Sequence, residues 1–395
     1  MRKFYLAIIF VSVLFFSCDS EENTELSDFE VFCEMVANDA KPIALSAPQR
    51  SDEMDANWDD YLKIATQYEV KIYRESNFPV TLLFPAGVTE GKEVAIIYRE
   101  PRFVQYEQLK ADLEKIDPIE AARRFGRLLG YNPQGINELL MKNTDFRTLD
   151  SFGVERQVTH LYYENVDEAK NFYQEVLGFR SIDSNRFMIS EDAILQLHAM
   201  DQDHPRGQAK STAIAFLTDQ LPEWYSDIQE QGVPIKYTYK PREGGPHDGF
   251  VAIDPGGYLL EFEQFKQHPE NELFMAYLEK APRIQTDIEN LNFYGSITWT
   301  YHNDLLGMQQ FYEEVLGFQL VADQGWTKIY RTSPTGFIGL VDERRGMMDY
   351  ANSKAVEIEW SVSDSAMNGY FAKSIYWSEE MNGLIGPEKY RYLLR

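Results

Sequence analysis

The chain has 395 residues, of which 44% are hydrophobic, and it contains 24 Tyr and 25 Phe. This length and composition exclude a disordered polymer and allow two or three domains with cores of their own. The 63 acidic residues against 38 basic ones give a net charge of -25 at pH 7. A field of that sign repels nucleic acid and anionic lipid, so neither is an expected partner.

The first residues have the layout of a secretion signal. Arg2 and Lys3 precede the apolar run "FYLAIIFVSVLFFS", which is short for a membrane span and ends at Cys18. The stretch "FFSC" resembles a bacterial lipoprotein signal, and "DSEEN" after it resembles the acidic tether of surface-exposed lipoproteins. The resemblance implies a signal peptide at residues 1–18, lipidation of Cys18 and a place in the cell envelope. The lipid would be the protein's only link to a bacterial membrane, and the outer surface of the cell is one location that this allows.

Residues 19–150 are predicted to form an α+β domain. The spacing of apolar residues predicts a helix over residues 56–73, strands at 80–85 and 93–100, and helices at 106–115, 118–131 and 133–143. This segment contains no His. We assign it no role. Only Cys33 follows Cys18, so no intramolecular disulfide is expected.

A repeated unit begins at residue 155. A strand leads into a helix over 166–178, whose end overlaps the motif "FYQEVLGF" at Phe172–Phe179 and is set by Gly178, and three short strands follow. The βαβββ pattern restarts after residue 210 and closes with "DPGGYLLEFEQF" near residue 266. After a linker at 267–291, "FYEEVLGF" at Phe311–Phe318 marks the same double unit again over 292–395, degenerate toward its end.

These motifs resemble the vicinal oxygen chelate superfamily, the group of glyoxalases, bleomycin-resistance proteins and extradiol dioxygenases. The resemblance implies an α+β fold class in which the N-terminal domain is followed by two modules of paired βαβββ units, at 155–266 and 292–395. Each pair would form a curled sheet around a cavity. In this superfamily the cavity often holds a divalent metal.

The resemblance also shows which metal ligands are missing. Val158 and Ala213 stand where the family has its two metal-binding His residues, whereas Glu261 stands at the position of the ligand carboxylate. Gln196 occupies an optional fourth position. His160 follows Val158 by two residues, so strand alternation turns it to the same side. We therefore consider a displaced metal site on Glu261 and His160, and weigh it against His160 as a hydrogen-bonded polar residue of a pocket wall.

The second module retains less of the pattern. Ile297 and Glu357 take its two His positions, and Leu393 replaces the carboxylate. We expect the last unit to support the fold. Aromatic residues of this module are candidates for a pocket lining or for core filling: Trp299, Trp326, Tyr330 and Trp360. His247 lies on a Gly-rich loop that borders either the pocket mouth or open surface.

Three functions are consistent with this sequence, and enzymatic activity stays open among them. The first is a protein that binds a small molecule in the first module, through the cavity residues His160, Gln196 and Glu261, without a cofactor. The alternative is a lyase, isomerase or dioxygenase that uses a divalent metal on Glu261 and His160. A further alternative is a surface module that interacts with a partner without catalysis.

Overall fold

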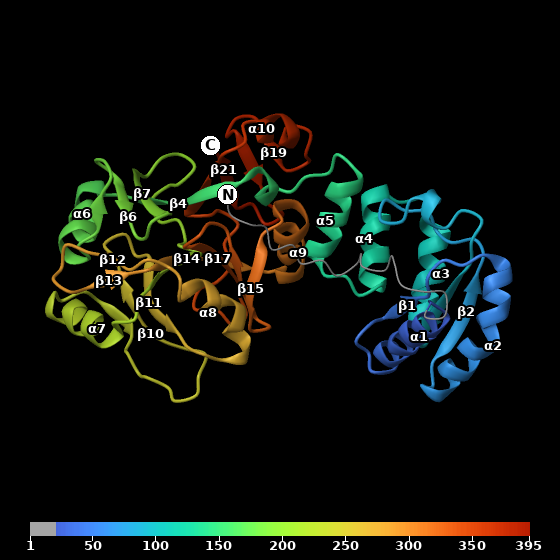
Figure 1. The fold of residues 1–395 in the computed structure, drawn as a ribbon. Coiled ribbons are helices and arrows are strands. Elements are labelled where there is room, and N and C mark those ends of the chain that lie inside the picture. Colours follow the sequence, from blue (N-terminus) through green and yellow to red (C-terminus); the bar gives the residue numbers. More distant parts are fainter. Residues whose placement is uncertain (1–20) are drawn as a thin grey trace, which may run out of the picture. The chain divides into compact units, whose positions relative to one another are not determined.

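The computed structural model describes residues 21–395 and divides the chain into two compact units, one ending at Phe146 and one spanning Arg147–Arg395 (Figure 1). The predicted signal peptide and the lipidation site Cys18 lie outside the described residues. No helix in the described part of the chain is long and apolar enough to cross a bilayer.

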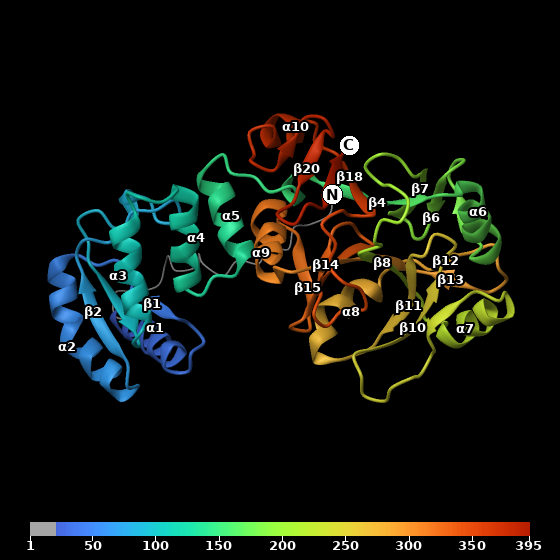
Figure 2. The same cartoon turned by 180° about the vertical axis from the view of Figure 1, so that it is seen from behind.

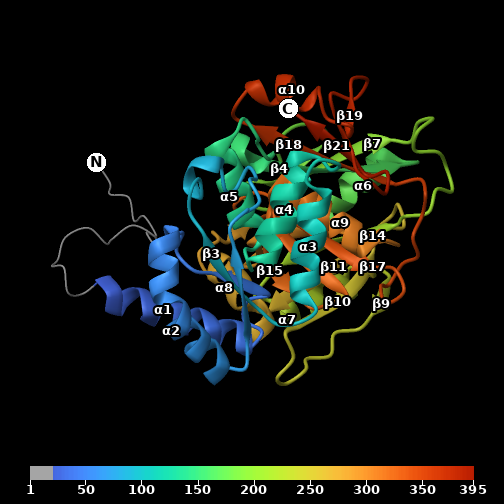
Figure 3. The same cartoon turned by 90° about the vertical axis from the view of Figure 1, so that its right-hand side faces the viewer.

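The first unit is a three-stranded antiparallel sheet of order β1-β3-β2 with helices packed on it. Helices α3 and α4 lie side by side (Figure 3). In chain order its elements are α1 (Glu21–Ala37), β1 (Ile43–Leu45), α2 (Ser51–Gln67), β2 (Lys71–Glu75), β3 (Val94–Tyr98), α3 (Arg102–Asp112), α4 (Pro118–Leu128) and α5 (Pro133–Asn143).

The first unit differs from the sequence prediction in several elements, and it contains helix α1 and strand β1, which were not predicted. The helix predicted over 56–73 ends at Gln67, because Glu69 takes a left-handed conformation (φ 56°) and the following residues alternate as strand β2. Residues 80–85 form no strand. Cys33 is fully buried in the core of this unit, where burial, and next the charge of Glu30, raise the pKa of its thiol to about 12.

The second unit contains the βαβββ pattern four times, which we call repeats 1 to 4. Repeat 1 comprises β4 (Val154–Tyr163), α6 (Val166–Asn171), β5 (Arg180–Ser181), β6 (Arg186–Met188) and β7 (Ala193–Ala199). Repeat 2 comprises β8 (Thr212–Leu217), α7 (Leu221–Glu230), β9 (Ile235–Tyr237), β10 (His247–Ile253) and β11 (Leu259–Phe265). A linker carries α8 (Glu272–Leu278) and the short pair β12 (Ile284–Gln285) and β13 (Asn292–Phe293).

Repeats 3 and 4 follow the linker. Repeat 3 comprises β14 (Gly295–His302), α9 (Leu305–Gln310), β15 (Gln319–Asp323), β16 (Thr327–Arg331) and β17 (Gly336–Asp342). Repeat 4 comprises β18 (Val356–Val362), α10 (Ala366–Phe371), β19 (Trp377–Ser378), β20 (Gly383–Ile385) and β21 (Arg391–Leu394). The twin motifs form a wider π-helical turn, at Phe172–Val176 and at Phe311–Leu316. The predicted caps Gly178 and Gly317 have φ values of 62° and 75°.

The predicted fold class is confirmed, but the repeats that were expected to pair do not share a sheet: repeat 1 is separated from repeat 2, and repeat 3 from repeat 4. Strand β4 of repeat 1 pairs antiparallel with β18 of repeat 4, which gives an eight-stranded sheet I of order β19-β20-β21-β18-β4-β7-β6-β5. Strand β8 of repeat 2 pairs with β14 of repeat 3, which gives an eight-stranded sheet II of order β15-β16-β17-β14-β8-β11-β10-β9. Figure 2 shows β4 in green beside the red β18. The backbone hydrogen bonds between two strands are the same for any residue type. The sequence therefore does not show which of the four similar first strands pair with each other.

The two sheets face each other. Their inner faces contact at the centre, where Thr159 Oγ1 of β4 and Thr298 Oγ1 of β14 lie 2.7 Å apart. Buried side chains of both sheets and of the helices form one shared core. Because side chains alternate along a strand, His160 and Trp299, the residues next to these threonines, point to the outer faces of sheets I and II.

Candidate functional site

The structure separates the predicted site residues into two places. His160 and Gln196 are direct register partners on β4 and β7 of sheet I. Glu261 is on β11 of sheet II, in the row that continues through Ala215 to Ile297 on the outer face. Both sheets therefore lie between His160 and Glu261. The expectation that they share one cavity does not agree with the strand pairing, because that expectation joined repeats 1 and 2 in a single sheet.

The outer face of sheet I carries a row of polar side chains across five strands. The register aligns Arg391, Glu357, His160, Gln196 and Arg186. Gln196 Oε1 accepts a hydrogen bond of 2.6 Å from Arg186 Nε. His160 Nδ1 lies 2.7 Å from Nε2 of His198. Burial, and next the proximity of His160, lower the pKa of His198 to about 4, so His198 is neutral at physiological pH.

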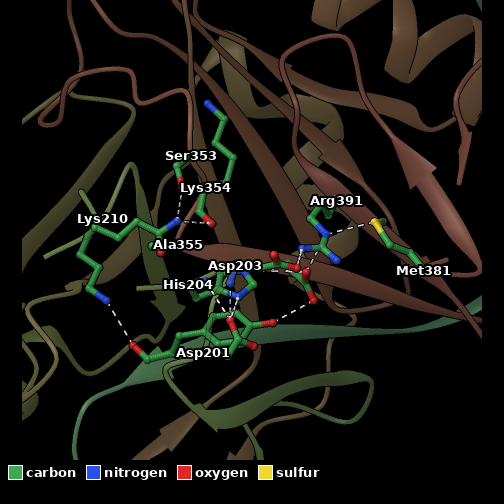
Figure 4. A network of polar contacts seen from close by, with 12 residues as sticks. Asp201, Asp203, His204, Lys210, Ser353, Lys354, Ala355, Met381 and Arg391 are labelled. Carbon is green, nitrogen blue, oxygen red and sulfur yellow. Dashed lines mark hydrogen bonds and ion pairs between the residues drawn. The ribbon is translucent and has the colours of Figure 1, made fainter. Parts of the chain in front are cut away.

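Glu357 is the centre of a network in this row. Figure 4 shows Arg391, Asp203 and His204, which belong to this network. Its carboxylate accepts a hydrogen bond of 2.8 Å from Tyr162 Oη and pairs with Arg391 Nε at 2.8 Å. His204 Nε2 lies 3.8 Å away, and Arg391 also binds Asp203 at 2.8 Å. The protein's own side chains therefore satisfy this carboxylate.

Glu359 is compensated in a similar way. Its carboxylate lies 3.5 Å from His160 Nε2, 3.8 Å from Arg186 and 3.9 Å from Arg395. Burial acts to raise the pKa of Glu359, but these three neighbours outweigh it and hold the pKa below its usual range. Arginine side chains thus cover both carboxylates of sheet I.

The residues present do not fit the divalent metal that the resemblance implies. In sheet I the carboxylates face guanidinium groups, which would repel a cation. In sheet II the register partner of Glu261 is Ala215, and the residues at the former His positions, Ala213 and Ile297, are apolar. Across residues 21–395, no group of three or more His, Cys, Asp or Glu side chains is placed to hold a metal ion. The predicted displaced site on Glu261 and His160 cannot assemble, since the two residues lie on different sheets.

Sheet II has a cavity of about 160 Å³ on its outer face. Strand alternation in "LLEFEQF" turns Glu261, Glu263 and Phe265 of β11 to this side. The remaining lining residues come from neighbouring strands and loops: His247, Trp299, Tyr301, Gln324, Trp326, Thr327, Val341, Arg345, Gly346 and Met347.

A glycine makes room for the indole ring that lines this cavity. Gly339 of β17 is the register partner of Trp299 on β14. A Cβ atom at position 339 would lie 1.9 Å from Cε3 of Trp299. The ring therefore occupies the space that a side chain at position 339 would need, and Trp299 is 7% exposed.

Two carboxyl groups share the cavity wall. Glu261 and Glu263 are 9% and 5% exposed. Burial raises the pKa of both, and the charge of Glu263 raises that of Glu261 further. The Trp299 indole opposes the rise at Glu263. Burial also lowers the pKa of His247, which keeps its ring neutral at physiological pH.

Three polar atoms at this cavity make no hydrogen bond of standard geometry within the described residues, although Trp299 and Glu261 lie close enough to the Glu263 carboxyl group to act on its pKa. The three atoms are Glu263 Oε2, Trp299 Nε1 and His247 Nδ1. Buried polar groups are nearly always paired in folded proteins, and each unpaired one costs about 1–3 kcal/mol. Donor and acceptor atoms without partners around one hollow are typical of a site that a ligand completes.

Sequence reasoning found part of this site. Glu261, Trp299, Trp326 and His247 were candidates, and the structure gathers them around one cavity. The other aromatic candidates, Tyr330 and Trp360, are fully buried in the shared core. Glu263 was not among the candidates. Its position two residues after Glu261 on one strand predicts that both side chains face the same side of the sheet.

Parts of this chain are similar to known proteins. Residues 156–262 match the family model described as the Glyoxalase/Bleomycin resistance protein/Dioxygenase superfamily. Glyoxalase I from Zea mays is 15% identical, covering 61% of this chain and 91% of its own, with a TM-score of 0.41. Lactoylglutathione lyase from Agrobacterium tumefaciens is 20% identical, covering 28% and 96%, with a TM-score of 0.24. No curated protein sequence matches this chain.

Proposed function

We propose that the protein, whose residues 156–262 match the family model of the Glyoxalase/Bleomycin resistance protein/Dioxygenase superfamily, binds a small organic molecule in the cavity of sheet II. The proposal retains the binding function expected from the sequence but changes its place. The ligand is held by Glu261, Glu263 and Trp299, whereas His160 and Gln196 belong to the network of sheet I.

The observation that supports this function most strongly is the set of unpaired atoms around the cavity. A hollow of about 150 Å³ holds a molecule of the size of benzene, and this cavity of about 160 Å³ is comparable. Aromatic and apolar walls with a few polar groups are the usual lining of a small-molecule site. The ion pairs that neutralise the carboxylates of sheet I make that face a poorer candidate.

The alternative functions have less support. A metal-dependent lyase, isomerase or dioxygenase needs several ligands around one ion, and neither face supplies them. A surface module without a ligand would leave the unpaired atoms of the cavity unexplained. That third function becomes the better account if no compound enters the cavity.

The test is thermal unfolding in the presence of a panel of neutral, acidic and basic compounds of the size of benzene. We expect at least one class to raise the melting temperature, because a ligand at about one hundred times its Kd stabilises the native state by about 2.7 kcal/mol. Val341→Phe fills the cavity and should abolish that rise. Ile182→Phe adds the same ring at a side chain that is 46% exposed and should preserve it.

Val341 is in the protein core, so Val341→Phe could disturb folding. A second variant therefore tests the cavity without a change in the core. Gln324→Trp narrows the cavity at its half-buried rim and should weaken binding without a loss of stability. No stabilisation by any compound, or equal stabilisation of Val341→Phe, would contradict the proposed function.

A further inference from the structure

We infer that the ligand of the sheet II cavity is a small organic cation, an amine or quaternary ammonium compound. The inference rests on the proposed function and adds the chemical class of the ligand. It follows from the two carboxyl groups, from the aromatic walls, and from a comparison of the two sheets.

Among residues 21–395, no ion pair joins Glu261 or Glu263 to a Lys, Arg or His side chain. Lys236 acts on Glu261 only through its more distant charge, and its Nζ donates a hydrogen bond of 3.3 Å to the Met347 carbonyl. Arg345 borders the cavity but is exposed, and its guanidinium lies 5.3 Å from the ring centre of Trp326.

Sheet I contains a comparable pair of acidic residues, and there the protein's own arginine side chains neutralise them. Glu357 and Glu359 are also two residues apart on one strand and face outward. There Arg391, Arg186 and Arg395 provide the positive charge. Sheet II has the pair of acids without the arginines, so an incoming cation would take the place that guanidinium groups take in sheet I.

The walls of the cavity suit an ammonium group that carries carbon substituents. Trp299, Trp326, Tyr301 and Phe265 border it, and the faces of such rings attract cations, particularly where water is excluded. A hydrated metal ion would gain little from these walls. An alkylammonium ion combines a diffuse positive charge with an apolar surface, which matches carboxylates set among aromatic rings.

The proton balance of binding follows from this chemistry. Without ligand, burial keeps the glutamate pair protonated well above the usual pH range of a carboxyl group. A cation beside the pair favours the carboxylate, so a proton leaves for the solvent as the cation enters. In its ionised form Glu263 is also a better acceptor for the unpaired indole N–H of Trp299.

Isothermal titration with choline and with its neutral isostere, 3,3-dimethyl-1-butanol, tests the inference. We expect choline to bind about tenfold more tightly than the isostere. Titrations at pH 6.5 in two buffers of different ionisation enthalpy should reveal proton release with choline only. The double variant Glu261→Gln, Glu263→Gln should lose this preference, whereas the exposed control Glu289→Gln should keep it.

A milder variant covers the case in which the double substitution disturbs folding. Trp326→Leu removes a ring at the half-buried rim and should weaken choline binding severalfold, with the isostere unaffected. Equal or tighter binding of the isostere, or of acidic compounds in the panel, would overturn the inference while the proposed function stands. Failure of every compound would overturn the proposed function itself.

Discussion

Deletion of residues 364–395 should abolish the cooperative unfolding of the second unit. The deletion removes strands β19, β20 and β21, which form one end of sheet I, and exposes the edge of β18. It also uncovers Trp360, whose ring is fully buried and stacks on Tyr392 with ring centres 5.0 Å apart and planes inclined by 6°. The sequence gives this repeat a degenerate appearance, yet its last strand lies deep in the fold.

The deleted segment also holds other parts of the fold in place. Tyr390 is fully buried, and its hydroxyl donates to the Ser211 carbonyl at 3.0 Å. The same hydroxyl accepts from the backbone N–H of Tyr301 at 2.8 Å. In the deletion, strand β18 loses its parallel partner β21, and the start of repeat 2 loses a tie to the core.

Differential scanning calorimetry of the full chain and the deletion would measure this effect. We expect the transition of the second unit to disappear and the protein to aggregate. The point variant Tyr392→Ala should cost about 3–5 kcal/mol, whereas Ile375→Ser, at a side chain that is 91% exposed, should change nothing. An unchanged cooperative melt of the deletion would show that repeat 4 is dispensable.

The double variant Glu261→Gln, Glu263→Gln should stabilise the protein at pH 8 by about 3 kcal/mol and have little effect near pH 4. Burial holds the pKa of both groups above the value of 4.5 that applies in an unfolded chain. A tenfold change in proton affinity corresponds to about 1.4 kcal/mol. The wild-type carboxyl groups therefore destabilise the native state at any pH where the unfolded chain would release their protons.

The sign of the pH dependence follows from proton uptake on folding. Below pH 4.5 both carboxyl groups are protonated in the folded and the unfolded chain, and they cost nothing. As the pH rises from 4.5 toward the higher folded-state pKa, the unfolded chain ionises first, so folding must take up protons and stability falls. Glutamine has no such proton, and the stability of the variant should therefore depend less on pH.

Urea denaturation of both proteins between pH 4 and pH 8 gives this difference directly. Glu289→Gln, at an exposed position, is the control that removes one charge without relieving burial. A destabilised double variant at pH 8, or a difference that does not vary with pH, would mean that the pair is not held protonated. Buried acidic residues that destabilise the native state are typical of functional sites.

The sequence contained enough information for the repeat but not for the pairing of the repeats. The twin motifs and their glycine caps predicted four βαβββ units, because a left-handed glycine ends a helix for local reasons. The partner of strand β4 was not predictable, since hydrogen bonding between strand edges carries no side-chain code. The prediction paired repeats 1 and 2 and therefore placed His160 and Glu261 in a common site. In the structure the two residues lie on the outer faces of different sheets.

Local alternation predicted the orientation of individual side chains better than it predicted their neighbours. Glu261 and Trp299 line one cavity, although His160 and Gln196, which were expected beside Glu261, do not belong to it. The arginines that neutralise Glu357 and Glu359 come from strands β6 and β21 and the C-terminal residue. Such a network depends on the tertiary arrangement, so no spacing in the sequence could reveal that sheet I is neutralised and sheet II is not.

The location of the ligand is tested most directly by the indole N–H resonances of the protein's six tryptophans. A ¹H–¹⁵N spectrum, assigned by single Trp→Phe variants, would be recorded during titration with the compound that stabilises the protein most. We predict a large shift for Trp299 and a smaller one for Trp326 at the rim, with Trp224 and Trp360 unchanged in the core. A shift of Trp360 or Trp224 with Trp299 unmoved would place the ligand elsewhere and contradict the account.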